Sequence, residues 1–188
     1  STQVFPLDGI PVMGTDYGQM VWNLWSVDRS IAMGRSPLST DLVFHPIGTS
    51  LAAHVLTPGF FPVATLARLL RGGDDLLYPI VAYKASIALG YALLAFSTFA
   101  FLRRIGVLPL SALAATLTYA FSPFAMLHAP HLNHLAVAAF LPLAAWCLVS
   151  AWESPRFAPG FGLALVFGLG PYFGELIVFA WAAFLAIS

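Results

Sequence analysis

Residues 79–102, PIVAYKASIALGYALLAFSTFAFL, decide the fold of this chain. Lys84 is the only charged side chain in the stretch. A helix crosses the hydrocarbon core of a bilayer with about 20 predominantly apolar residues, and this stretch has that length. We therefore interpret residues 79–102 as a transmembrane helix.

Three further apolar stretches follow it, over residues 108–127, 132–152 and 161–188. The whole chain of 188 residues is 60% hydrophobic and 9% charged, whereas about a quarter of the residues in soluble domains are charged. The sequence predicts an all-α membrane protein in two parts. Residues 1–78 form an external region with juxtamembrane helices, and residues 79–188 form a bundle of about four transmembrane helices.

The charges of the chain exclude one class of partner and orient the predicted spans. The net charge is zero and no stretch is rich in Lys or Arg, so membrane lipids are expected as partners and nucleic acid is not. Arg103 and Arg104 join the first two spans, and Arg156 joins the last two. By the positive-inside rule these loops are cytoplasmic, which puts residues 1–78 and 128–134 on the external face.

The external region contains one clear helical pattern, which begins at Asp16 and ends at Gly34. Polar residues from Asp16 to Ser30 follow a spacing of three and four on one face, and apolar residues fill the other. Trp22 and Trp25 suit the level of the lipid headgroups, so we expect an amphipathic helix along the membrane surface. Residues 50–70 are interrupted by Pro, Gly and His, and predict two short juxtamembrane helices; one crossing helix is the alternative.

Two acidic residues of the external region are candidates for chemistry. Asp16 opens the predicted helix with Gln19 three residues later, which is the pattern of a capping box. The alternative is a carboxylate that accepts a proton or binds a divalent cation. Asp41 suits a turn, although His45 is close enough in sequence to share a site with it.

Ionisable residues near the predicted spans are further candidates. His128, His131 and His134 recur every three residues and could bind zinc, but Pro130 breaks the helix that would align them, so a loop that caps the third span is preferred. Lys84 could extend to the membrane surface or serve a site. Glu175 follows Gly170, Pro171 and Gly174, which could open the last span toward a cavity.

Several stretches resemble one superfamily of membrane enzymes. DYGQMVWNLW at residues 16–25, followed by Gly34, Pro37, Thr40-Asp41, Phe44, Pro46 and Gly48, resembles the first external loop of bacterial C-type (GT-C) glycosyltransferases. AFSP at 120–123 and HLN at 131–133 are similar to stretches that close and open later spans in that group. The resemblance implies a multi-pass protein of the bacterial cytoplasmic (inner) membrane that transfers a sugar from a polyprenyl-phosphate donor to an external acceptor.

The resemblance also implies roles for single residues. An acidic residue of the first external loop acts as the base or helps to hold a divalent cation, which implies Asp16 in that role and Asp41 as a second polar contact. Lys84 is implied as the contact to the donor phosphate. The expected site has two catalytic residues, Asp16 and Asp41, and these substrate-binding residues: Gln19, Asn23, His45, Lys84, His131, Asn133 and Glu175.

Besides sugar transfer, two other functions stay open: that of an accessory subunit and that of a transporter. Members of the superfamily have a first transmembrane helix, more spans and a C-terminal external domain, so this chain is expected to be a fragment of an enzyme or a non-catalytic accessory subunit of a larger membrane complex. The third function is transport through a site near Pro171 and Glu175.

Overall fold

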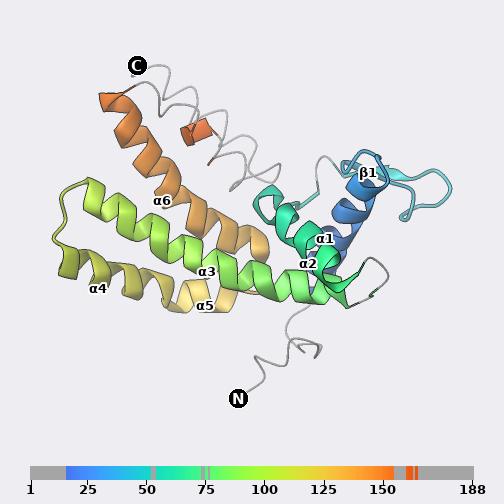
Figure 1. Ribbon diagram of the computed structural model, residues 1–188, viewed down its shortest axis with the longest axis horizontal. Coiled ribbons are helices and arrows are strands. Elements are labelled where there is room, and N and C mark those ends of the chain that lie inside the picture. The colour runs from blue at the N-terminus through green and yellow to red at the C-terminus, as the bar shows by residue number, and fades with distance from the viewer. Residues whose placement is uncertain are drawn as a thin grey trace, which may run out of the picture.

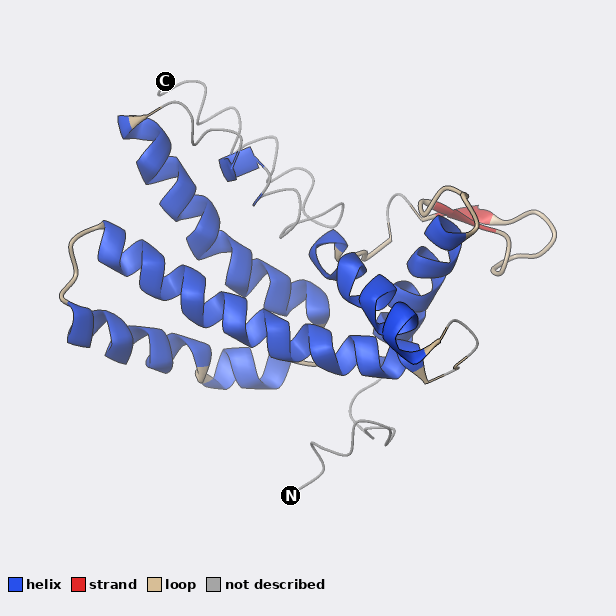
Figure 2. Ribbon diagram, viewed as in Figure 1, coloured by secondary structure: helices blue, strands red, loops and turns tan. Residues whose placement is uncertain are grey.

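The computed structural model describes residues 16–51, 54–72, 75, 77–154, 160–162 and 164, and most of them are helical (Figures 1 and 2). The elements in chain order are α1 (Tyr17–Ala32), β1 (Ser39–Thr40), β2 (Thr49–Ser50), the 3-10 helix η1 (Pro58–Phe60), α2 (Phe61–Arg71), α3 (Tyr78–Arg104), α4 (Pro109–Ala120), α5 (Pro123–His128) and α6 (Leu132–Glu153). The strands β1 and β2 pair antiparallel, with Ser39 opposite Ser50.

The long helix α3 is the centre of the structure. It packs against α6 and α4 along its length, while α1 and α2 gather at its N-terminal end (Figure 1). Within the described part of the chain, α3 and α6 are the two helices with the length and apolarity to cross a membrane. They coincide with the predicted spans 79–102 and 132–152.

Small residues allow α3 and α6 to approach each other closely. A Cβ atom added at Gly90 of α3 would lie 2.4 Å from Cδ2 of Leu135 on α6 and 3.3 Å from the ring of Phe60. Nearby, the Ser97 hydroxyl donates to the backbone carbonyl of Ala139 at 2.6 Å. Such small residues and hydroxyl bonds are typical of helices that associate in lipid, where apolar burial alone gives little preference for a helix partner.

The second predicted span is not one continuous helix, which corrects the prediction for residues 108–127. Helix α4 ends at Ala120 and α5 begins at Pro123. Pro123 has no N–H to continue the ladder, and Ser122 is extended with its hydroxyl accepting a hydrogen bond from the Ala125 N–H. Of the fourth predicted span only residues 161, 162 and 164 are described; Phe161 and Ala164 pack beside Ala144 and Cys147 of α6.

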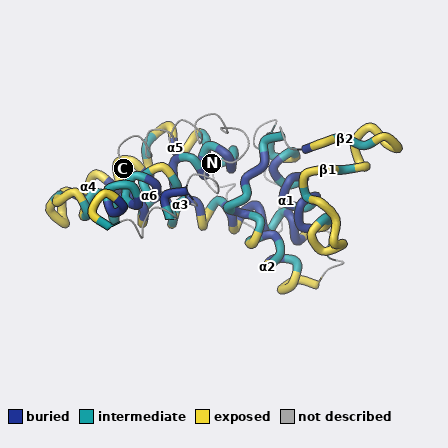
Figure 3. The backbone as a smooth tube through the Cα atoms, turned by 90° about the horizontal axis from the view of Figure 1, so that it is seen from above, coloured by how far each residue is buried: buried dark blue, intermediate teal, exposed yellow. Residues whose placement is uncertain are grey.

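The outer faces of the helices are apolar. Figure 3 shows that much of α4 is exposed, whereas many residues of α3 and α6 are buried. Leu110 and Leu127 are 79% and 74% exposed, although they are large hydrophobic residues. The interior, by contrast, contains many alanines and buried hydroxyls. Large apolar side chains outside and small residues inside suit an apolar solvent around the bundle.

Helix α1 occupies the predicted residues, but its faces are not arranged as predicted. Asn23, Ser26 and Asp28 are at most 3% exposed, while Ile31 is half exposed. These polar residues therefore lie in the interior together with the apolar Leu24 and Val27, and α1 does not separate into an exposed polar face and a buried apolar face. Burial of these groups is tolerated because Asn23 and Asp28 have partners in the fold.

A buried ion pair joins α1 to α2. The Asp28 side chain is fully buried, and its two oxygens accept from Nε of Arg68 at 2.7 Å and from the Thr65 hydroxyl at 2.8 Å. Tyr78, the first residue of α3, is a further hydrogen-bond partner of the same carboxylate. Around this polar group, α1, η1, α2, α3 and α6 contribute side chains to one apolar core.

Residues 50–70 do not form one crossing helix. Helix α2 has 11 residues, which at 1.5 Å per residue is about 16 Å, and the 3-10 helix η1 precedes it. This length is about half of a bilayer core, and the two short helices that were predicted correspond to one short α-helix preceded by a 3-10 helix of three residues. With no crossing at this point, Asp16 and the histidine loop are free to meet on one side of the bundle.

We expect Asp28→Asn to lower the free energy of unfolding by about 3 kcal/mol, because it leaves the half-buried Arg68 cation without its counter-charge. Asp75→Asn is the matched control: it removes a carboxylate from a more exposed pair with Arg71 and should lower the stability much less. Denaturant unfolding of the detergent-solubilised chain measures both. Equal effects of the two substitutions would contradict the role assigned to the buried pair.

Gly90→Val should separate α3 from α6 and cost about 1–3 kcal/mol, because the new side chain overlaps Leu135. Gly18→Ala, where a Cβ meets nothing within 4 Å, should be neutral or stabilising. The melting temperature in detergent reports both changes. Addition of Leu135→Ala to Gly90→Val should recover part of the loss, and no recovery would show that the contact is not the cause.

Candidate functional site

Asp16 and His131 form the first feature of the candidate site. Oδ2 of Asp16 lies 3.1 Å from Nδ1 of His131, although 114 residues separate the two positions in the sequence. The Asp16 side chain is 44% exposed and the His131 side chain 31%. Asp16 occupies the N-cap position of α1 but makes no capping hydrogen bond through its side chain. The carboxylate is therefore not used as the predicted helix cap, and it remains accessible to solvent.

The three histidines gather beside this carboxylate. The ring centroids of His128 and His134 lie 5.0 Å apart and nearly parallel, and His131 lies within about 6 Å of both. Nδ1 of His128 donates to the carbonyl of Phe124 at 2.9 Å, and its ring stacks on that residue. The break between α5 and α6 thus brings together imidazoles that a regular helix would place at different angles.

The residues around Asp16 hold the loop between α5 and α6 in place. The Tyr17 ring packs edge-on against Tyr83 of α3 at 5.0 Å, and the Tyr83 hydroxyl donates to the carbonyl of Pro130 at 2.9 Å. Burial raises the pKa of Tyr17, so its hydroxyl is neutral at physiological pH. That hydroxyl has no hydrogen-bond partner among the described residues. Tyr17 and Tyr83 position the start of α1 against the start of α6.

The histidine cluster does not form a metal centre in this structure. Across the described ranges, no three His, Cys, Asp or Glu side chains are arranged to hold a metal ion. What the arrangement can do chemically is donate and accept protons, and a carboxylate and imidazoles that lie this close can orient one another by hydrogen bonds.

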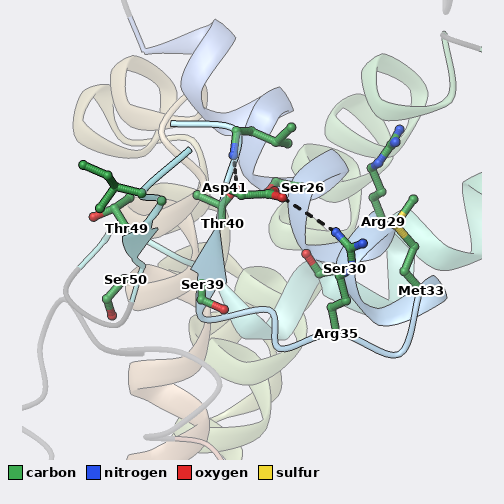
Figure 4. Close-up of a pocket in the computed structure, with 13 residues that line it drawn as sticks. Ser26, Arg29, Ser30, Met33, Arg35, Ser39, Thr40, Asp41, Thr49 and Ser50 are labelled. Carbon is green, nitrogen blue, oxygen red and sulfur yellow. Dashed lines mark hydrogen bonds and ion pairs between the residues drawn. The ribbon is translucent and has the colours of Figure 1, made fainter. Parts of the chain in front are cut away.

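Asp41 lies away from this cluster, in a cavity of about 720 Å³ between the C-terminal half of α1 and the β1–β2 hairpin. Figure 4 shows Arg35 reaching toward Asp41, and the two side chains approach to 3.9 Å. Asp16 begins α1, whereas the cavity adjoins its last two turns. The two carboxylates predicted as catalytic therefore do not meet. His45 is exposed in the hairpin loop, and the structure brings it to neither the cavity lining nor the histidine cluster.

The side chain of Asn23 has a structural role. Its side-chain NH₂ donates to the carbonyl of Val55 at 2.7 Å, and its oxygen lies 2.9 Å from Nε2 of His54. The side chain thus joins α1 to the segment before η1, and it is 2% exposed. This geometry explains Asn23 without a ligand.

The other predicted substrate-binding residues are dispersed. Gln19 is half-buried in the first turns of α1, and Lys84 is 9% exposed in the second turn of α3. Asn133, in the first turn of α6, is 7% exposed, and its oxygen has no hydrogen-bond partner among the described residues. Glu175 lies outside the described residues, as do Pro171 and the cavity predicted there.

Sequence reasoning missed Asp28, Tyr17 and Tyr83. Asp28 follows Val27 in a helix with a mixed pattern, so nothing local marks it as the partner of Arg68. The one available signal was Arg68 itself, a cation in an apolar segment that needs a counter-charge.

A second ion pair, Arg71 with Asp75, lies at the end of α2. The pKa of Asp75 is lowered by a hydrogen bond from the Leu77 N–H and by Arg71.

Comparison of the chain with known protein families, characterised proteins and solved structures finds no match.

We expect Asn23→Ala to lower the free energy of unfolding by about 1–3 kcal/mol, because the partly buried carbonyl of Val55 loses its donor. Gln19→Ala, on the same helix, should change it by less than about 0.5 kcal/mol. Unfolding curves, with hydrogen exchange at residues 54–57, distinguish the two variants. An Asn23→Ala protein of unchanged stability would restore a ligand-binding role for this residue.

Proposed function

We propose that this chain is the membrane-embedded part of a glycosyltransferase that moves a sugar from a polyprenyl-phosphate donor to an acceptor on the external face of the bacterial inner membrane. The observation that carries the proposal is the Asp16–His131 pair: an accessible carboxylate, held by a histidine, at the end of two apolar helices. The two segments that contain Asp16 and His131, residues 16–25 and 131–133, are also segments that resemble GT-C sequences.

The proposed chemistry needs one base. Asp16 accepts the proton of the acceptor hydroxyl as the acceptor oxygen forms its bond to the anomeric carbon. The bond from that carbon to the phosphate oxygen breaks, and the polyprenyl phosphate leaves with the electron pair. His131 is a positioning residue, because its hydrogen bond orients the Asp16 carboxylate. Lys84 is the proposed contact to the donor phosphate.

The proposed orientation rests on the ends of the helices. Arg103 and Arg104 lie at the C-terminal end of α3, where Arg104 pairs with Glu153 of α6, and Asp16 lies at the other end of the bundle. Positive residues favour the cytoplasmic side, which supports an external position for Asp16 and the histidines.

The alternative is a non-catalytic accessory subunit of a membrane complex. It is favoured by one observation, the exposed apolar tip of the hairpin, where Phe44 is 74% and Ile47 is 92% exposed. Apolar side chains of this size at a loop tip suit contact with another protein.

Asp16→Asn should abolish sugar transfer, a loss of at least about 100-fold, because an amide cannot accept the proton. His131→Gln should reduce transfer less, and Asp75→Asn should leave it unchanged. The assay follows labelled hexoses and pentoses from polyprenyl-phosphate donors to lipid and glycan acceptors in proteoliposomes.

Full transfer by Asp16→Asn would remove the base assignment. Absence of transfer from every donor, together with co-purification of a stable complex, would favour the accessory subunit.

A further inference from the structure

The cavity beside Asp41 is lined by charged and polar residues that have no role in the proposed sugar transfer. It is bounded by the last two turns of α1 and by the β1–β2 hairpin (Figure 4). Two arginines, Arg29 and Arg35, and one carboxylate, Asp41, line it, so its formal charge is +1. Six further lining residues carry hydroxyl side chains: Ser26, Ser30, Ser39, Thr40, Thr49 and Ser50.

Neither arginine is neutralised by a close ion pair within the described part of the chain. Arg29 lies over the Trp25 ring, with its guanidinium carbon 5.3 Å from the ring centroid. Arg35 approaches Asp41 only to 3.9 Å, and both side chains are about two-thirds exposed. An exposed pair at this distance contributes little, about 0–1 kcal/mol, so an anion can take the place of Asp41 at Arg35.

The lining suits a particular class of anion. The guanidinium fork matches the oxygens of a phosphate and binds them through charge-assisted hydrogen bonds. Serine and threonine hydroxyls both donate and accept, as the hydroxyls of a sugar do. The volume, about 720 Å³, lies in the range of small-molecule sites.

We propose that this cavity binds the phosphate group of a sugar phosphate or other polyol phosphate. Arg35 holds the phosphate, and hydroxyl side chains of α1 and of one face of the hairpin hold the polyol. Asp41 competes with the ligand for Arg35. The inference is independent of the proposed transferase, because the cavity lies at the opposite end of α1 from Asp16.

Gly48 shapes the wall of the cavity. Its φ is +73°, and a Cβ atom there would lie 2.7 Å from the carbonyl oxygen of Thr40. Any side chain at this position forces β2 away from β1. Gly48→Ala should therefore deform the site while the helices stay intact.

The test is calorimetric binding of glucose 1-phosphate to the full chain in detergent, with uncharged methyl glucoside for comparison. Glucose 1-phosphate should bind saturably, and methyl glucoside should bind at least about tenfold more weakly. Arg35→Gln should weaken binding of glucose 1-phosphate by about tenfold, the loss of one charge-assisted bond. Asp41→Asn should tighten it, because it removes the competing carboxylate.

Arg71→Gln is the matched control, since it removes an equal charge from α2 outside the cavity and should leave binding unchanged. Gly48→Ala should abolish binding without changing the far-ultraviolet circular dichroism. The proposal is overturned if no saturable binding occurs, if methyl glucoside binds as tightly, or if Arg71→Gln weakens binding as much as Arg35→Gln.

Binding measured in nanodiscs distinguishes two possible ligands, a lipid headgroup and a free sugar phosphate. Competition by phosphatidylglycerol against glucose 1-phosphate would identify a lipid headgroup as the ligand. Binding that is equal in phosphatidylcholine discs with and without phosphatidylglycerol would identify a free sugar phosphate.

Discussion

The ion pair of Asp28 with Arg68 is the constraint on which the packing of α1 against α2 depends. A carboxylate with no exposed surface is stable only where its charge is compensated, and here Arg68, Thr65 and Tyr78 all reach it. These partners come from α2 and from the first residue of α3. The pair therefore fixes the direction in which α1 leaves the bundle, as well as its contact with α2.

That direction has a consequence at the other end of α1. Once the helix lies against the start of α3 and α6, its first residues reach the loop before α6, and Tyr17 packs on Tyr83. Asp16 then meets His131, and the break between α5 and α6 brings His128 close to the other two rings. The same helix, by its length, keeps Asp41 away from Asp16. The structure thus places Asp16 in an acid–histidine cluster and Asp41 in a separate cavity, although both residues belong to the same part of the sequence.

Particular residues explain which predictions succeeded. The α3 and α6 spans were predictable because each is a long apolar run, a property that the chain carries locally. Helix α2 was predictable as a short helix because Pro58, Gly59 and Pro62 interrupt the run. The break between α4 and α5 was missed, since Ser122-Pro123 lies inside an apolar stretch whose average composition still suits a span. The burial of polar residues on α1 was missed because polar side chains were assigned to a surface, whereas Asn23 and Asp28 are buried with partners more than 30 residues away.

From the sequence alone the chain could be predicted to be mainly helical, with long apolar stretches, among them those of α3 and α6, that suit membrane spans, and with polar and ionisable residues concentrated outside them. Hydrophobic periodicity, proline and glycine act over a few residues, so these features need no knowledge of the fold. Only the tertiary structure decided what each ionisable side chain contacts. Asp16 matches a helix cap locally and turned out to pair with His131, because the partner of a charge is chosen by packing between distant segments and not by its neighbours in sequence.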